Sequence, residues 1–181
     1  MLRMRVAGVV LAGGQSRRFG SDKAEEIFEG RSLLDWSLAA LEPHVELLLV
    51  SGRPHPRHLT VADRPAAGLG PLGGLAGALA VAHDRGFTHL LSLPCDTPRL
   101  PHGLLDALRI HPEGRFVAAC PVIGFWPTRL GAALEAHLAA GGARSMRAWT
   151  QSAGIAPLDW AADIPNMNVP ADLAGLGGAH G

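Results

Sequence analysis

Cysteine is scarce in this chain, which contains only Cys95 and Cys120 among its 181 residues. Two thiols that follow no C-x-x-C spacing exclude a disulfide framework and favour a reducing compartment. They also supply no zinc motif, and the close histidine pair His55 and His58 is flanked by prolines typical of an irregular loop. We therefore interpret the histidines as scattered surface residues.

Net charge is also absent, because sixteen basic residues balance sixteen acidic ones. A chain without an overall positive field is not expected to bind nucleic acid or an anionic membrane. The apolar stretch 71–82 is about a dozen residues long, short of the roughly 20 that a membrane span requires. Neither the N-terminal run 1–11 nor the twin arginine at 17–18 continues as an export signal. We expect a cytoplasmic protein in which any anion binding is local.

Two kinds of hydrophobic pattern alternate along the chain. Apolar runs typical of buried strands occupy residues 5–11, 45–51, 88–93 and 116–122. Helical patterns occupy residues 32–41, 71–84, 101–110, 128–140 and 145–151. This alternation predicts a single-domain, Rossmann-like α/β fold with a mainly parallel sheet and helices on both faces. We assign residues 1–174 to the domain and the Gly-rich residues 175–181 to a flexible C-terminal tail.

The loop that follows the first predicted strand carries the strongest functional signal. In open α/β sheets, ligands bind beyond the carboxyl ends of the strands. Gly13 and Gly14 let the backbone approach a ligand and direct N–H groups at it, while Arg17, Arg18 and Lys23 add positive charge. These features predict a phosphate-binding loop.

Lysine is nearly absent, since fifteen of the sixteen basic residues are arginine and Lys23 is the only lysine. An ammonium group is a compact charge on a flexible stem, which suits a crowded triphosphate better than a planar guanidinium. The alternative is a solvated basic loop in which Lys23 has no special role.

Because Gly20 is separated from Lys23 by two residues, the loop is not a P-loop, which disfavours an ATPase or GTPase switch.

A literal G-x-G-x-x-G spans residues 68–73, with Asp96 at a suitable distance for a ribose contact. The pattern is also the signature of dinucleotide binding. It lies in mid-chain without a long preceding strand, so we disfavour that interpretation.

Two aspartates follow apolar runs. Asp96 comes after residues 90–93 and should stand at the carboxyl end of a strand, facing the first loop. Mg²⁺ on a polyphosphate takes one or two carboxylates, so Asp96 is the predicted metal ligand; the alternative is that it caps the following Asp-Thr-Pro turn. Asp63 ends the run 59–62 and could reach a nucleoside, or could simply form an ion pair with the adjacent Arg64.

Asparagine occurs only as Asn166 and Asn168. Residues two apart in an extended segment point to the same face, so the two amides can bind one polar ligand or a metal-bound water. The alternative is that both are ordinary turn residues before a helix.

Four motifs, in order over most of the chain, resemble those of the molybdenum cofactor guanylyltransferases. The motifs are Leu11-Ala12-Gly13-Gly14-x-Ser16-Arg17-Arg18-x-Gly20-x-Asp22-Lys23, Gly70-Pro71-Leu72-x-Gly74, Cys95-Asp96-x-Pro98-x-Leu100-Pro101 and Asn166-x-Asn168-x-Pro170-x-Asp172-Leu173. The resemblance implies a nucleotidyltransferase fold and transfer of GMP from GTP to the terminal phosphate of molybdopterin, with release of pyrophosphate.

The resemblance also implies roles for individual residues. GTP would be held by Leu11, Ala12, Gly13, Gly14, Lys23, Asp63 and Asp96. Asp96 would bind Mg²⁺, catalysis would rest on Lys23, Asp96 and Arg17, and Asn166 with Asn168 would bind the acceptor. Transient contact with proteins that deliver or receive the cofactor is expected.

Two other functions remain open at this point. A cytidylyltransferase or sugar-nucleotide-type enzyme would use the same loop with another base or acceptor. A non-catalytic GTP-binding regulator would bind the nucleotide and release no pyrophosphate. Cys120 and Val169 stand where the family more often has histidine and threonine, positions that concern the acceptor or base more than the phosphates.

Overall fold

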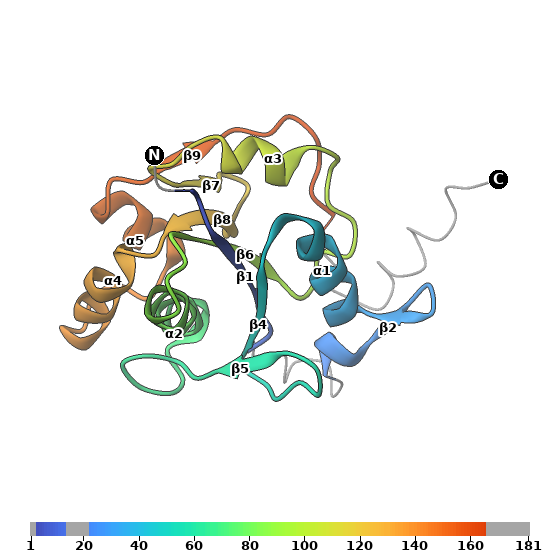
Figure 1. Ribbon diagram of the computed structural model, residues 1–181, viewed down its shortest axis with the longest axis horizontal. Coiled ribbons are helices and arrows are strands. Elements are labelled where there is room, and N and C mark those ends of the chain that lie inside the picture. The colour runs from blue at the N-terminus through green and yellow to red at the C-terminus, as the bar shows by residue number, and fades with distance from the viewer. Residues whose placement is uncertain (1–2, 14–21, 166–181) are drawn as a thin grey trace.

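The computed structural model describes residues 3–13 and 22–165 (Figure 1). The strands in these residues are β1 (Val6–Leu11), β2 (Ile27–Phe28), β3 (Arg31–Ser32), β4 (Leu47–Ser51), β5 (Leu59–Val61), β6 (His89–Pro94), β7 (Arg115–Val117), β8 (Cys120–Pro127) and β9 (Ala156–Leu158). The α-helices are α1 (Leu33–Leu41), α2 (Gly70–Asp84), α3 (Leu104–Arg109), α4 (Leu130–Ala139) and α5 (Met146–Ser152). Two 3₁₀ turns, η1 (Lys23–Glu25) and η2 (Glu42–His44), join them.

Seven of the described strands form one sheet in the order β5-β4-β1-β6-β8-β7-β9. The pairs β5–β4, β4–β1, β1–β6 and β7–β9 are parallel, and only β8 runs antiparallel to its two neighbours. The predicted mainly parallel sheet is therefore confirmed. Because β1, β4, β5 and β6 run in the same direction, their carboxyl ends meet at one edge of the sheet, where ligands bind in such folds.

Helices cover both faces of the sheet, as predicted (Figure 1). Strand β1 is buried along its whole length, and its side chains alternate between the faces. Ala7 and Val9 pack in a core with α2, α4 and α5, whereas Val6 and Val10 pack in a second core with α1 and α3. A strand buried on both faces needs apolar residues at every position, which explains the unbroken apolar run in the sequence.

The predicted strand at 116–122 was wrong. The structure turns at Ala118 and Ala119 within that run, so that β7 and β8 form an antiparallel hairpin and β8 continues to Pro127. The pairing shifts register between Phe116 and Val117. The sequence did not predict the hairpin, because a continuous apolar run has no periodicity that would indicate a turn at two small residues such as Ala118 and Ala119.

Several helices also begin later in the chain than predicted. Ser32 and Ser145 are the N-caps of α1 and α5, accepting hydrogen bonds from the backbone N–H groups of Asp35 and Ala148 at 3.1 Å. The helix predicted at 101–110 begins only at Leu104, after Gly103 in a left-handed conformation with φ +79°.

Helix α2 packs very closely against the exits of β4 and β5. A methyl group added at Gly77 would overlap the carbonyl oxygen of Ala62, and one added at Gly74 would overlap Ser51 Oγ. Gly73 lies against Asp63 in the same way, with an added Cβ 3.1 Å from its Cβ. Gly73, Gly74 and Gly77 thus allow the close packing of α2 on the strands, which brings the start of α2 to the pocket edge of the sheet.

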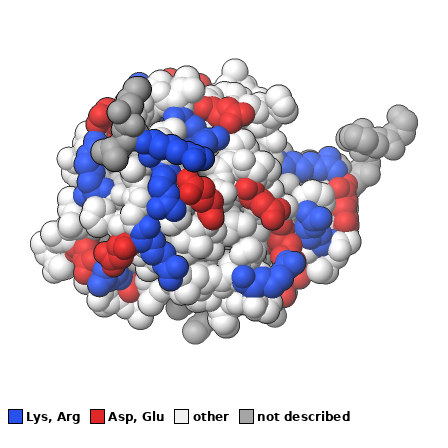
Figure 2. All heavy atoms as spheres, viewed as in Figure 1, with Lys and Arg blue, Asp and Glu red and all other residues white. Residues whose placement is uncertain are grey.

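The surface carries both signs of charge. Basic and acidic side chains are interspersed over the face shown in Figure 2, in keeping with the balanced composition. Among the described residues, no helix combines the length and apolar character needed to cross a membrane.

Candidate active site

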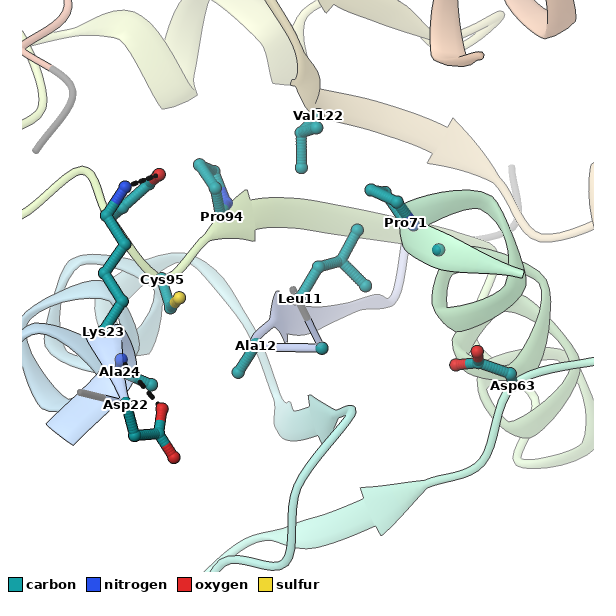
Figure 3. A pocket seen from close by; sticks show the side chains of 13 residues that line it. Leu11, Ala12, Asp22, Lys23, Ala24, Asp63, Pro71, Pro94, Cys95 and Val122 are labelled. Carbon is teal, nitrogen blue, oxygen red and sulfur yellow. Dashed lines mark hydrogen bonds and ion pairs between the residues drawn. The ribbon is translucent and has the colours of Figure 1, made fainter. Parts of the chain in front are cut away.

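A pocket of about 220 Å³ opens at the carboxyl ends of β1 and β6 (Figure 3). Its walls come from the first loop, the exits of β5 and β6, the start of α2 and the start of β8. The lining residues are Leu11, Ala12, Gly13, Asp22, Lys23, Ala24, Asp63, Gly70, Pro71, Pro94, Cys95, Asp96 and Val122. The structure thus brings together all the described residues predicted to hold the nucleotide, which are Leu11, Ala12, Gly13, Lys23, Asp63 and Asp96.

Lys23 and Asp96 form an ion pair at one wall of this pocket, with Nζ 2.9 Å from Oδ2. Lys23 belongs to η1, where Asp22 is the N-cap and accepts a hydrogen bond from the Ala24 N–H group at 3.2 Å. Asp96 follows β6 after only one intervening residue, as the sequence predicted. Each side chain of the pair is about 20% exposed, so the charges are partly shielded and still reachable from the pocket.

The second carboxylate oxygen of Asp96 is buried and has no hydrogen-bond partner. Buried polar atoms are normally paired, and an unpaired one at a pocket commonly marks a contact made by a ligand or ion. No group of three or more histidine, cysteine or acidic side chains able to hold a metal occurs within residues 3–13 and 22–165. A cation here would need oxygens from a bound ligand or water to complete its shell, which is how Mg²⁺ binds to polyphosphates.

Asp63 lies across the pocket from Lys23 (Figure 3). Its Oδ2 accepts a hydrogen bond from the Gly68 N–H group at 3.1 Å, which closes the loop leading to α2. The alternative of an ion pair with Arg64 is wrong, because Arg64 pairs with Glu135 at 3.6 Å. The Asp63 carboxylate therefore lies at the pocket wall opposite Lys23.

The start of α2 forms the same wall as Asp63. Gly70 and Pro71 line the pocket, and the N-cap Leu69 has no side chain that could accept hydrogen bonds from the first turn. Because Pro71 has no N–H group, the start of this 15-residue helix adds partial positive charge beside the pocket mainly through its dipole.

The packing of the loop requires glycine at position 13. A Cβ added at Gly13 would lie 2.9 Å from the Cα atom of Gly52, whose own φ is +90°. The neighbouring Ala12 N–H group donates to the Ser51 carbonyl oxygen at 2.9 Å. The exits of β1 and β4 are thus in backbone contact, which the sequence alone did not indicate.

No pattern in the sequence pointed to Arg53, which follows Gly52. Its guanidinium donates to Asp22 Oδ1 at 2.7 Å and to Glu25 Oε1 at 2.6 Å. Only its position at the carboxyl end of a strand could have suggested it.

Cys95 lines the pocket next to Asp96 but is not a nucleophile at neutral pH. Burial, with a smaller contribution from the Asp96 carboxylate, raises the pKa of the Cys95 thiol to about 11. Below that pH the group stays a neutral thiol, and only the thiolate attacks efficiently. The Cys95 thiol therefore supplies no nucleophile to this pocket.

Gly14, Arg17, Asn166, Asn168 and the predicted tail 175–181 lie outside the described residues. Their assigned roles stay predictions.

Known proteins share this sequence pattern and this fold. A family described as the MobA-like NTP transferase domain matches residues 8–154. A molybdenum cofactor guanylyltransferase of Cereibacter sphaeroides is 36% identical over 183 residues, covering 94% of this chain and 95% of that protein. One from Rhodobacter capsulatus is 33% identical, covering 94% of each chain.

Solved structures agree on the fold. The molybdopterin-guanine dinucleotide biosynthesis protein A of Archaeoglobus fulgidus superposes with a TM-score of 0.69 at 18% identity, covering 93% of this chain and 95% of that one. The 2-C-methyl-D-erythritol 4-phosphate cytidylyltransferase of Thermus thermophilus gives 0.68 at 18% identity, covering 92% and 94%. With the family match over most of its length and these relatives, the chain belongs to the MobA-like NTP transferase family of nucleotidyltransferases.

Proposed function

We propose that this enzyme transfers GMP from GTP to the terminal phosphate of molybdopterin and releases pyrophosphate. The observation that carries the proposal is the Lys23–Asp96 pair, held at 2.9 Å in a pocket at the carboxyl ends of β1 and β6. Relatives that are 33–36% identical over nearly the whole chain bear the name molybdenum cofactor guanylyltransferase, which favours GTP and molybdopterin over other substrates.

In this reaction an oxygen of the acceptor phosphate attacks the α-phosphorus of GTP. The new P–O bond forms as the bond to the β-phosphate oxygen breaks, and that oxygen leaves with pyrophosphate. No protein nucleophile is needed, in keeping with the neutral Cys95 thiol. Catalysis then depends on holding the two phosphates in line and on stabilising the developing charge.

The chain's own groups supply that charge and alignment. The Lys23 ammonium lies at the pocket wall and can neutralise phosphate oxygens, while Asp96 fixes its position. The start of α2 adds the positive end of its helix dipole on the opposite wall. Asp63, across from Lys23, accepts hydrogen bonds and so suits the hydroxyl or amino groups of a nucleoside.

We also propose that Mg²⁺ assists, with Asp96 as its protein ligand. The unpaired, buried Oδ1 of Asp96 and the absence of a larger acidic cluster in the described residues fit an ion completed by phosphate oxygens and water. When bound, Mg²⁺ would neutralise charge on the pyrophosphate leaving group.

We place the reaction in the cytoplasm, with GTP and molybdopterin as small-molecule substrates and neither nucleic acid nor membrane as partner. Balanced composition and interspersed surface charge support this view. Transient contact with proteins that deliver or receive the cofactor is part of the proposal.

The test is a panel of GTP, CTP, ATP and UTP with Mg²⁺, read as thermal shift and as pyrophosphate release with and without molybdopterin. We expect the largest shift with GTP, and pyrophosphate only when molybdopterin is present. A preference for CTP would favour the cytidylyltransferase alternative. GTP binding without pyrophosphate from any acceptor would favour the regulator.

Lys23→Ala is expected to weaken GTP binding by roughly 1.5–3 kcal/mol, or about ten- to a hundredfold, because a partly buried charge-assisted contact is lost. Isothermal titration calorimetry of both proteins measures the change. Lys23→Arg is the matched control for charge, and we expect only partial recovery since a planar guanidinium fits the pocket differently. Unchanged affinity in Lys23→Ala would remove this residue from the nucleotide site.

A further inference from the structure

Arg53 connects the exit of β4 to the turn that carries Lys23. One terminal nitrogen donates to Asp22 and the other to Glu25, at 2.7 and 2.6 Å, so the fork spans both ends of η1. The Arg53 side chain is 17% exposed, although Asp22 and Glu25 are 59% and 64% exposed. A guanidinium shielded in this way holds its two carboxylates more firmly than a fully solvated pair would.

The same short segment, Ser51–Arg53, also fixes the beginning of the first loop. Ser51 accepts the hydrogen bond from the Ala12 N–H group, and Gly52 lies against Gly13. Residues 12–13 and residues 22–25 are therefore both attached to the exit of β4. Strand β4 therefore sets the distance between residues 12–13 and residues 22–25, the two segments on either side of the predicted phosphate-binding loop. No residue of β4 itself lines the pocket.

We propose that Arg53 is a positioning residue that holds η1 in place and thereby keeps the Lys23 ammonium at Asp96. Arg53 does not line the pocket, so it acts through Lys23 and not on the substrate. The value of this arrangement for catalysis rests on the proposed function, since a fixed ammonium matters where a triphosphate binds. The positioning itself rests only on the contacts of Arg53, Asp22 and Glu25.

The chain offers a direct probe, because Lys23 is its only lysine. An amine-reactive ester labels Lys23 and the N-terminal amine, and peptide mass spectrometry separates the two, so the N-terminus serves as an internal reference. Without any nucleotide, Arg53→Met is expected to raise the labelling rate of Lys23 by about tenfold, the equivalent of ~1.4 kcal/mol. The N-terminal rate is expected to stay the same.

Three further variants make the result specific. Arg57→Met removes a 71% exposed arginine of the same loop, whose pair with Asp35 is 3.4 Å long, and should leave Lys23 labelling unchanged. Arg53→Lys keeps one charge without the fork and should restore part of the protection. Glu25→Gln removes the charge of the exposed partner of Arg53 and should raise the labelling rate of Lys23. This variant keeps the test possible if Arg53→Met fails to fold. Unchanged Lys23 labelling in the folded Arg53 and Glu25 variants would overturn the proposal.

Nucleotide binding then separates positioning from a general loss of structure. If Arg53 acts through Lys23, Lys23→Ala combined with Arg53→Met binds GTP no more weakly than Lys23→Ala alone. Additive losses would mean that Arg53 supports the fold in general and would overturn the inference. A wild-type protein that binds no triphosphate, but shows the expected labelling, would contradict the proposed function and leave the positioning role established.

Discussion

Replacing Asp96 with asparagine is expected to lower turnover by about 10²–10³-fold, while nucleotide affinity changes far less. The amide keeps the shape of the carboxylate but carries no charge. It can no longer hold the Lys23 ammonium as an ion pair, and it offers a weaker ligand at the buried oxygen that has no partner. Both losses act on charge stabilisation during the reaction more than on ground-state binding.

Steady-state pyrophosphate release at saturating GTP gives the turnover, and calorimetry gives the affinity. Asp106→Asn is a suitable control, because this aspartate is 68% exposed on α3 and lines no part of the pocket. We expect that control to match the wild-type rate. Normal turnover of Asp96→Asn at limiting Mg²⁺ would show that the metal is held elsewhere.

Adding one methyl group at Gly77 is expected to destabilise the protein by about 3 kcal/mol, although alanine is the better helix former. The reason is that the new Cβ would occupy the place of the Ala62 carbonyl oxygen, which belongs to backbone that cannot rotate away. Helix α2 would have to move outward. Because Asp63 follows Ala62 and Pro71 lies in the first turn of the helix, the pocket that both residues line should widen with it.

Urea unfolding of Gly77→Ala measures the effect, with Ala80→Gly as the comparison in the same helix. Ala80 is half-buried, and its loss should cost only the ~1 kcal/mol typical of glycine in a helix. We expect Gly77→Ala to be the less stable of the two. A Gly77→Ala protein more stable than wild type would mean that helix propensity outweighs the contact with Ala62.

Much of the fold was predictable because a strand buried on both faces has a nearly continuous apolar sequence. The runs 5–11 and 88–93 indicated interior strands because they are mainly apolar and show no regular apolar–polar alternation, and the cores confirm this. The run 116–122 is equally apolar throughout, so its sequence did not indicate the turn within it. The two-residue strands β2 and β3 were missed because so short a hairpin has no pattern of its own.

The site was predictable where a residue directly follows a strand or lies in the loop after it. Lys23 and Asp96 are 73 positions apart, yet both could be placed at the pocket because parallel strands end at a common edge. The contact of Gly13 with Gly52 and the fork of Arg53 were not predictable. Each depends on how β1 and β4 leave the sheet side by side, and no local sequence pattern encodes that geometry.

The pocket joins segments from Leu11 to Val122, and this spread governs when it can exist during synthesis. A nascent chain that has reached only Asp96, just past the end of β6, contains Lys23 and Asp96 but lacks the strand β8 that supplies Val122. Strand β8 pairs with the edge of β6 that faces away from β1. The pocket wall is therefore complete only after the hairpin of β7 and β8 has left the ribosome. Any ligand of this pocket therefore binds only molecules in which β8 has folded, and it stabilises these in preference to partial ones.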